Sequence, residues 1–256
     1  MAQTAIALDE ITKRYGEHIA LGPVNLTLPA GQFTALVGPS GSGKTTLLKT
    51  INRLVLPDVG QVEIQGRNAT ATADHLLRRQ IGYVFQEIGL FPHMTVAENI
   101  AITPKLLGWP GDRISSRVAN LLGLVDLPAD AGARFPAQLS GGQRQRVGVA
   151  RALAAQPQIL LMDEPFGALD PATRQALGRD VRALHDQLEL TTVMVTHDMT
   201  EAILLADQIV VLKDGKILAK GTPSALAGSS IAEVAAMMDG PRRQAEQLRA
   251  KLAVTS

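Results

Sequence analysis

The sequence has no cysteine among its 256 residues, and aromatic residues make up only 3% of it. Without thiols the chain can form no disulfide, thiolate metal site or iron–sulfur cluster. It also lacks the run of roughly 18 apolar residues that a membrane-spanning helix needs. Residues 1–10 show no basic segment followed by an apolar core. We therefore expect a cytoplasmic chain that reaches a membrane only through another subunit.

A strong imbalance of charge is missing as well. The chain has 25 Lys and Arg against 24 Asp and Glu, which gives a net charge of +1. This balance predicts no general attraction to nucleic acid. What remains is a globular composition, 46% hydrophobic and 19% charged. At this length it indicates one domain with subdomains and a sizeable core.

The dominant motif is a glycine-rich loop that matches the phosphate-binding pattern of two glycines five positions apart, followed by Lys and Thr. Phe33–Val37 before it is β-prone, and apolar residues after it recur at helical spacing, so the loop joins a strand to a helix. This context disfavours the alternative of an accidental Gly/Ser loop. The motif consists of Gly38, Pro39, Ser40, Gly41, Ser42, Gly43, Lys44, Thr45 and Thr46.

Each part of this loop has a predicted task. Its backbone N–H groups and the positive end of the following helix would hold a polyphosphate. Lys44 would reach the β and γ phosphates, and the Thr45 hydroxyl would ligate the Mg²⁺ ion that bridges them. The loop therefore predicts a nucleotide site.

Short strands are expected on either side of the loop. Thr4–Asp9 and Gln61–Ile64 alternate apolar and polar residues, and Asp58–Gly60 is typical of a turn. We interpret the two alternating segments as antiparallel pieces that flank the nucleotide. Tyr15, just before Gly16, could stack on a base or serve only in packing.

The next predicted strand, Ile81–Phe85, ends at Gln86. A glutamine there can reach a metal ion through its carbonyl oxygen, although a lone glutamine is normally just solvated. An apolar group follows, and it is either core or a partner-binding patch: Ile88, Leu90, Phe91 and Met94. Helical spacing then predicts a mainly helical insert between about Val96 and Leu139.

A second short motif precedes a predicted helix over Arg144–Ala155. It reads Leu139, Ser140, Gly141, Gly142 and Gln143. Serine and glycines at a helix start can bind an anion, which would make a second phosphate site in one chain. An ordinary helix cap is an equally good interpretation.

Two apolar segments bring polar residues to one sheet edge. Ile159–Met162 predicts a buried strand that ends at Asp163 and Glu164, and Thr192–Thr196 carries His197 at its end. Adjacent carboxylates are costly unless a cation or a reacting water uses them. We assign Asp163 to the Mg²⁺ shell and Glu164 to the water, whereas a histidine in this place is often merely hydrogen-bonded.

The rest of the chain predicts a hairpin from Ile209–Leu212 to Ile217-Leu218 and a helical tail from about Ser224. Four basic residues of the tail are expected on a solvated face, with a membrane-surface role as the alternative: Arg242, Arg243, Arg249 and Lys251.

With these motifs and Ala168-Leu169-Asp170 in this order, residues 4 to 225 closely resemble the ATP-binding subunit of ABC transporters. The resemblance implies an α/β fold of the phosphate-loop NTPase class, with a RecA-like core, an antiparallel β subdomain and a helical subdomain at about 96–156. The ATP-binding domain would span 4–240, and 241–256 would be a C-terminal tail.

The same resemblance implies specific roles. Tyr15 would stack on adenine, Gln86 would link the metal site to a membrane subunit, and Glu164 would be the general base. His197 would hold the γ-phosphate together with Lys44. ATP and Mg²⁺ would be the bound groups, with Thr45, Gln86 and Asp163 around the metal.

The resemblance also implies a head-to-tail homodimer with two ATP molecules between the protomers. The segment Ser140, Gly141, Gly142 and Gln143 would contact the γ-phosphate held by the other protomer. Asp170 would communicate across the dimer. One chain would thus carry two phosphate sites because each completes its partner's.

Further partners implied are integral-membrane permease subunits and a periplasmic or lipid-anchored solute-binding protein, with no nucleic acid. The chain would lie on the cytoplasmic face of the plasma membrane. Gln86–Ile100, Ile51–Leu54 and Thr103–Leu107 are similar to the osmoprotectant branch, which imports glycine betaine, choline, carnitine or related quaternary amines. The sequence ends at Ser256 without the paired C-terminal regulatory modules that many members carry, which leaves ionic-strength gating through such modules an open question.

Two alternatives accompany this interpretation. The chain could serve a different transporter: another importer, an exporter or a lipid transporter. It could instead be a soluble ABC ATPase that works on DNA or ribosomes, although such proteins usually carry two cassettes or long insertions.

Overall fold

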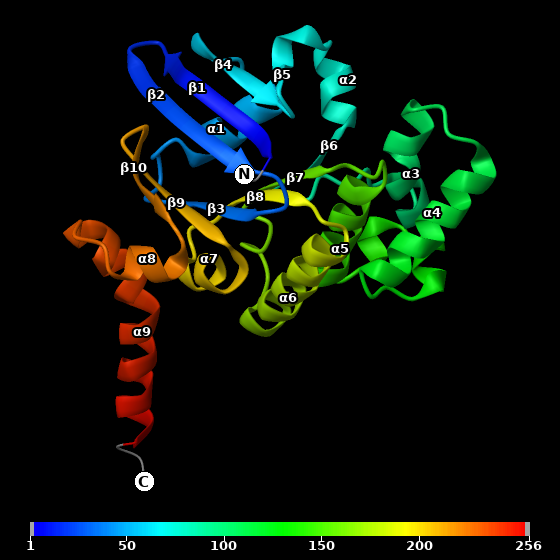
Figure 1. Ribbon diagram of the computed structural model, residues 1–256. Helices are drawn as coiled ribbons and strands as arrows, with labels where there is room; N and C mark the ends of the chain where they lie inside the picture. Colours follow the sequence, from blue (N-terminus) through cyan, green and yellow to red (C-terminus); the bar gives the residue numbers. More distant parts are fainter. Residues whose placement is uncertain (1–2, 254–256) are drawn as a thin grey trace.

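The computed structural model describes residues 3–253, and its elements are shown in Figure 1. The strands are β1 (Thr4–Tyr15), β2 (His18–Pro29), β3 (Phe33–Val37), β4 (Val59–Ile64), β5 (Arg67–Asn68), β6 (Ile81–Val84), β7 (Ile159–Asp163), β8 (Thr191–Val195), β9 (Gln208–Lys213) and β10 (Lys216–Gly221). The α-helices are α1 (Lys44–Ile51), α2 (Asp74–Arg79), α3 (Val96–Leu106), α4 (Gly111–Leu124), α5 (Gly141–Leu153), α6 (Pro171–Gln187), α7 (Met199–Leu205), α8 (Pro223–Ala227) and α9 (Ala232–Ala253). Short 3₁₀ turns are η1 (Ala69–Ala71), η2 (Ala129–Ala133) and η3 (Pro136–Gln138).

The central sheet has the strand order β10-β9-β3-β8-β7-β6, and all neighbours are parallel except the β9–β10 hairpin. All residues of β3, β7 and β8 are buried, because both faces of the sheet are covered. Successive side chains of β3 therefore enter different cores. Phe33 and Ala35 pack with α6 and α7, whereas Leu36 packs with α1 and the second sheet. This confirms the predicted α/β class.

The second sheet is antiparallel, in the order β2-β1-β4-β5, and covers α1 (Figure 1). The sequence predicted Thr4–Asp9, but β1 continues to Tyr15 through bulges, and Glu10 has a φ of 51°. No strand was predicted over β2, where Gly22-Pro23 interrupts the alternation of apolar residues. This long hairpin places Tyr15 and His18 beside the phosphate loop.

The predicted turn over Asp58–Gly60 is wrong in part, because β4 begins at Val59. Gly60, with a φ of 90°, lies inside this strand, where a Cβ would collide with the carbonyl oxygen of Asp9 on β1. The glycine serves close approach of two strands. Asp58 fixes the entry to β4 by accepting hydrogen bonds from Lys13 Nζ at 2.9 Å and Arg14 N at 2.7 Å.

The predicted helical insert is confirmed by α3 and α4. Thr95 and Glu98 form a capping box at the start of α3. The predicted helix over Arg144–Ala155 is α5, which begins three residues earlier, at Gly141, because Ser140 caps it. The apolar group after Gln86 divides: Leu90 packs against the core, whereas Phe91 is 44% exposed.

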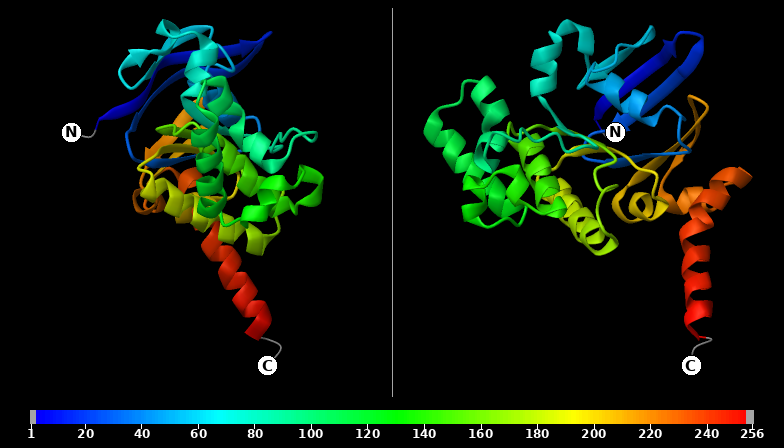
Figure 2. Two further views of the ribbon diagram at one scale, coloured as in Figure 1. Left: turned by 90° about the vertical axis from the view of Figure 1, so that its right-hand side faces the viewer. Right: turned by 180° about the vertical axis from the view of Figure 1, so that it is seen from behind.

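The predicted hairpin is β9–β10, and the helical tail is α8 and α9. Figures 1 and 2 show α9 projecting from the body of the molecule, and it crosses residue 240 without a break. Arg242 and Arg243 are exposed, as predicted, and pair with Glu246 and Asp239 along the helix. Within residues 3–253, no helix combines the length and apolar character needed to cross a bilayer.

Candidate functional site

The phosphate loop joins β3 to α1 and depends on glycine at two positions. At Gly38, with a φ of 144°, a Cβ would collide with the Leu212 carbonyl oxygen. At Gly43, with a φ of 95°, a Cβ would lie 2.5 Å from the Ala20 carbonyl oxygen. Only glycine allows the loop to turn this tightly between β2 and β9. The turn gathers backbone N–H groups at the start of α1, as an anion site requires.

Lys44 places its ammonium group over this loop. Its Nζ donates hydrogen bonds to the carbonyl oxygens of Gly38 and Pro39, each at 2.9 Å. Burial lowers the pKa of Lys44, and the negative charges of Glu164 and Asp163 partly oppose that shift. The cation is thus held among groups that a phosphate could replace.

Asp163 ends β7 and is 4% exposed. Its Oδ1 accepts a hydrogen bond of 2.8 Å from Thr45 Oγ1, so the two predicted metal ligands meet. Two residues that the sequence analysis missed approach Oδ2: the Tyr83 hydroxyl at 3.4 Å and Lys49 Nζ at 3.7 Å. Burial and the charge of Asp163 raise the pKa of Tyr83, which keeps its hydroxyl protonated. Lys49 could have been found, because it follows Thr45 by one helical turn.

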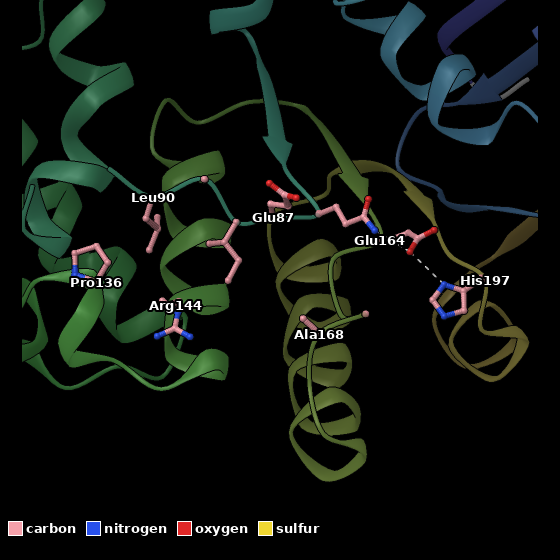
Figure 3. A pocket seen from close by; sticks show the side chains of 11 residues that line it. Glu87, Leu90, Pro136, Arg144, Glu164, Ala168 and His197 are labelled. Atoms are coloured by element: carbon pink, nitrogen blue, oxygen red, sulfur yellow. Dashed lines mark hydrogen bonds and ion pairs between the residues drawn. The ribbon is translucent and has the colours of Figure 1, made fainter. Parts of the chain in front are cut away.

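Glu164 lies just beyond the end of β7 and has a φ of 45°. Its backbone N–H donates to the Val195 carbonyl oxygen of β8 at 3.0 Å, which fixes this conformation. Its Oε2 accepts a hydrogen bond of 3.3 Å from Gln86 Nε2 and lies 3.3 Å from His197 Nδ1 (Figure 3). Two predicted site residues, Gln86 after β6 and His197 after β8, therefore converge on one carboxylate oxygen of Glu164.

Two cavities meet at Glu164 and His197. The first, of about 490 Å³, is lined by Tyr15, His18, Ala20, residues 40–46, Glu164 and His197. The second, of about 580 Å³, extends toward Pro136 and Arg144 on the helical side, as Figure 3 shows. Tyr15 is 52% exposed, so its ring is available to a ligand rather than used in the core. His18 was missed, although it follows Tyr15 closely across the β1–β2 turn.

The second predicted phosphate motif is not part of either cavity in the described chain. Ser140 Oγ accepts from Gln143 N at 3.2 Å, and Gln143 Oε1 accepts from Ser140 N at 3.0 Å. This is the ordinary cap that the sequence left open as an alternative. At Gly142 a Cβ would lie 2.6 Å from Thr173 Cγ2, so α5 approaches α6 closely here.

Asp170 is likewise used locally. It caps α6 by accepting hydrogen bonds from Ala172 N and Thr173 N at 3.1 Å. Hydrogen bonds from the Thr173 side chain and from these amides lower the pKa of Asp170. The chain thus brings together Tyr15, the loop, Asp163, Glu164 and His197, and leaves Ser140–Gln143 and Asp170 outside.

The oxygen atoms at Thr45 and Asp163 fit a magnesium ion. Mg²⁺ prefers hard oxygen ligands and is usually bound by one or two carboxylates together with substrate phosphates. Among residues 3–253, no group of three or more His, Cys, Asp and Glu side chains could hold a metal ion without such help. The Ser42 hydroxyl in the same loop is buried without a hydrogen-bond partner, as expected of a ligand cradle.

Known proteins are similar to this chain over the region that holds most of these motifs. Residues 21–167 match the family model described as ABC transporter. Over 219 residues, the chain is 52% identical to the choline transport ATP-binding protein OpuBA of Bacillus subtilis. This alignment covers 85% of this chain and 58% of that protein. The chain is 49% identical over 218 residues to the sulfate/thiosulfate import ATP-binding protein CysA of Synechocystis, covering 85% and 61%. The chain thus spans a little over half the length of these relatives.

The fold has a close match among solved structures. A dimeric ATP-binding cassette, MJ0796 in a post-hydrolysis state bound to ADP and Pi, aligns with a TM-score of 0.76 and 35% identity. The alignment covers 85% of this chain and 98% of that one.

Proposed function

The chain belongs to the ABC transporter family, and from this premise we propose that it hydrolyses ATP to drive a small solute through a separate membrane permease. One observation carries the proposal: Lys44, Thr45, Glu164 and His197 line one cavity beside the phosphate loop, and Asp163 accepts a hydrogen bond from Thr45. The ADP and Pi of the similar cassette dimer support the same substrate.

In this proposal the phosphates lie on the loop amides and Lys44, and the adenine stacks on Tyr15. Thr45 and Asp163 would hold a Mg²⁺ ion, with Gln86 beside them, and this ion would neutralise phosphate charge when bound. Glu164 orients a water molecule in line with the γ-phosphorus atom and accepts its proton. The new bond joins the water oxygen to phosphorus, and the bond to the β-phosphate oxygen breaks. His197, 3.3 Å from Glu164, holds the γ-phosphate.

We place the reaction in a homodimer. Ser140 is exposed at the start of α5, and Gly141, Gly142 and Gln143 are half-buried there, outside their own chain's nucleotide cavity. In a head-to-tail dimer they reach the γ-phosphate on the partner's loop, and Asp170 lies at the interface. ATP then holds two protomers together until hydrolysis separates them. The dimeric state of the similar cassette supports this arrangement.

A groove next to Gln86 is our candidate for permease docking. It has a volume of about 460 Å³ and is lined by apolar and basic residues from the core and helical parts, among them Leu54, Arg79, Phe85, Phe91 and Arg151. Leu54, Phe85 and Phe91 are large apolar side chains exposed to solvent, which marks an interaction surface. Permease movement here would reach Glu164 through Gln86, 3.3 Å away. The subunit would thus sit on the cytoplasmic face of the membrane.

For the cargo we propose a quaternary amine such as choline or glycine betaine, delivered by a solute-binding protein. The named function of OpuBA supports this choice. Sulfate is the second candidate, because CysA is nearly as similar. Side chains of this subunit would not touch the cargo.

The test is uptake of radiolabelled choline, glycine betaine and sulfate into cells that carry either the wild-type chain or Glu164→Gln as their only copy. We expect the mutant to lose amine uptake and to keep sulfate uptake. If only sulfate uptake is lost, the cargo is sulfate and not a quaternary amine. If no uptake changes while purified Glu164→Gln has lost ATP hydrolysis, the amine assignment is wrong and the ATPase remains.

A separate experiment addresses the alternative of a non-transport ATPase. The wild-type chain should sediment with membranes only when its permease is co-expressed. Sedimentation with ribosomes or DNA instead would contradict the transport proposal.

A further inference from the structure

The connection between α3 and α4 exposes a compact apolar tip. We call residues Leu106, Leu107, Gly108, Trp109 and Pro110 the α3–α4 tip. Leu106 is 56% exposed and Leu107 is 40% exposed. Neither leucine belongs to the hydrophobic cores of the described chain. Figures 1 and 2 show this connection at the outer edge of the molecule, far from α9.

The backbone holds the tip in a defined shape. Gly108 has a φ of 72° and its N–H donates to the Lys105 carbonyl oxygen at 3.0 Å. Trp109 N donates to the Pro104 carbonyl oxygen at 3.1 Å, so the chain folds back on the end of α3. This ordered turn exposes Leu106, Leu107 and Pro110 and leaves Trp109 half-buried.

Basic groups surround these apolar residues. The Arg113 guanidinium carbon lies 3.6 Å from the centroid of the Trp109 ring, a close cation–π contact. Arg79 Nη1 donates to the Leu106 carbonyl oxygen at 3.1 Å, and Lys105 is exposed next to Leu106. One acidic residue, Asp112, lies in the same stretch. The tip is therefore apolar at its end and cationic around it.

We propose that the α3–α4 tip rests in the headgroup region of an anionic bilayer. Tryptophan suits this region because its ring is apolar and its N–H group is polar. Arg and Lys can bury their stems while their charged ends meet lipid phosphates. Leu106 and Leu107 would enter the boundary of the acyl chains.

The position of Arg79 agrees with this orientation. The same side chain that contacts Leu106 also lines the groove proposed for the permease. If the permease docks there, the tip lies on the rim of that surface and faces the bilayer. Only this orientation rests on the proposed function, because lipid binding by the tip can be measured without permease or ATP.

A charged, interfacial contact of this size predicts weak and reversible binding. Two leucines and one tryptophan bury far less apolar area than a lipid anchor or a spanning helix. Salt should weaken the contact by screening the arginines and Lys105. The contact would therefore orient a subunit whose main attachment is the permease.

The sequence supplies its own probe, because Trp109 is the single tryptophan of the chain. We would add vesicles of phosphatidylglycerol or of phosphatidylcholine to the full-length protein and record tryptophan emission. We expect a blue shift with the anionic vesicles, reversal by salt, and quenching by lipids brominated near the headgroup.

Variants then separate tip binding from general adhesion. Leu106→Ser with Leu107→Ser should weaken the affinity for anionic vesicles by about tenfold, the scale expected for partial burial of two leucines. Leu204→Ser changes a leucine that is 67% exposed on α7 and should have no effect. Arg113→Glu should weaken binding to the anionic vesicles specifically. ATP binding, measured in parallel, should be normal in all three.

The proposal is overturned if anionic vesicles leave the emission unchanged. It is equally overturned if emission shifts only with vesicles that contain the permease, since the tip would then be a protein contact. It is overturned as well if the double serine variant binds like the wild type. Failure of the wild-type protein to bind ATP would contradict the proposed function and leave the lipid result standing.

Discussion

The two phosphate motifs differ in what their own chain provides. At the loop Gly38–Thr46, side chains from distant elements complete the site: Asp163 accepts a hydrogen bond from Thr45, and Glu164 and His197 line the same cavity. At Ser140–Gln143 the partners are local, since Ser140 and Gln143 cap each other. The first motif is a nearly complete site, and the second is a partly exposed helix start. In the dimer that we propose, another chain brings the ligand of the second motif.

This comparison has a physical basis. A buried lysine beside two carboxylates requires the fold of the whole core to hold it in place. A helix start needs only its own first turn to present free N–H groups. In the proposed dimer, groups that must be fixed before ATP binds are therefore built into one protomer, whereas groups that sense the bound state lie on the other. Variants at Glu164 and Lys44 change the first site, and a variant at Ser140 changes the second motif.

The largest effect is expected at Glu164. Glu164→Gln keeps the shape of the side chain but removes its basicity, so steady-state ATP hydrolysis should fall roughly 10²–10⁴-fold. ATP binding should remain, because the loop is unchanged. Phosphate release and nucleotide binding measure the two quantities. Glu189→Gln, at an exposed glutamate far from the loop, is the control. Unchanged turnover in Glu164→Gln would remove this residue from the role of general base.

Lys44→Ala should act on binding itself. Charge-assisted hydrogen bonds from the ammonium group to phosphate would be lost, which should weaken ATP affinity by about 10–100-fold. Isothermal titration calorimetry measures this, with Lys216→Ala on β10 as a surface control. A normal affinity in Lys44→Ala would mean that the loop is not the phosphate site, and the contrast between the motifs would disappear.

Ser140→Ala tests the second motif directly. It should cost about 1 kcal/mol of stability through the lost cap. ATP affinity of the monomer should stay normal, while ATP-dependent dimerisation weakens by about tenfold because a partner's phosphate loses a donor. Thr95→Ala removes the equivalent cap of α3 and should show only the stability loss. Sedimentation velocity and thermal melting measure both. If the two variants dimerise equally, Ser140 serves only as a helix cap.

The smallest effect concerns pH. Burial lowers the pKa of Lys44 from 10.5, so its ammonium group loses its proton at a lower pH than a free lysine does. Only the protonated form attracts phosphate, and ATP affinity should therefore weaken with rising pH already below the range in which a free lysine titrates. Lys44→Arg should flatten this profile if it still binds ATP, because arginine stays charged. If the ATP affinity of the wild type does not change over this pH range, Lys44 does not lose its proton there.

The strands and helices that surround the site were largely predictable. Continuous apolar runs predicted β3 and β7, because both faces of these strands are buried. The edge that gathers Asp163, Glu164 and His197 followed from parallel strand ends. By contrast, β2 was missed because Gly22-Pro23 interrupts a strand with two register shifts nearby, where bulges make the pairing irregular.

The site residues that the sequence did not reveal are held by tertiary contacts. Tyr83 reaches Asp163 across neighbouring strands, and His18 lies at the nucleotide cavity through the β1–β2 hairpin. No motif spacing encodes either contact. The roles of Ser140 and Asp170 stay predictions, because one chain shows only their local use as caps.

The left-handed backbone at Glu164 has a consequence for selection experiments. A residue with a side chain is disfavoured at a φ of 45°, whereas glycine adopts it freely. Replacement by glycine would relieve this local strain while removing the carboxylate. A screen of variants for heat resistance alone would therefore tolerate, or even enrich, a protein that no longer turns over its substrate. Stability favours glycine at this position, whereas activity requires the carboxylate, so directed evolution of the chain has to select for both at once.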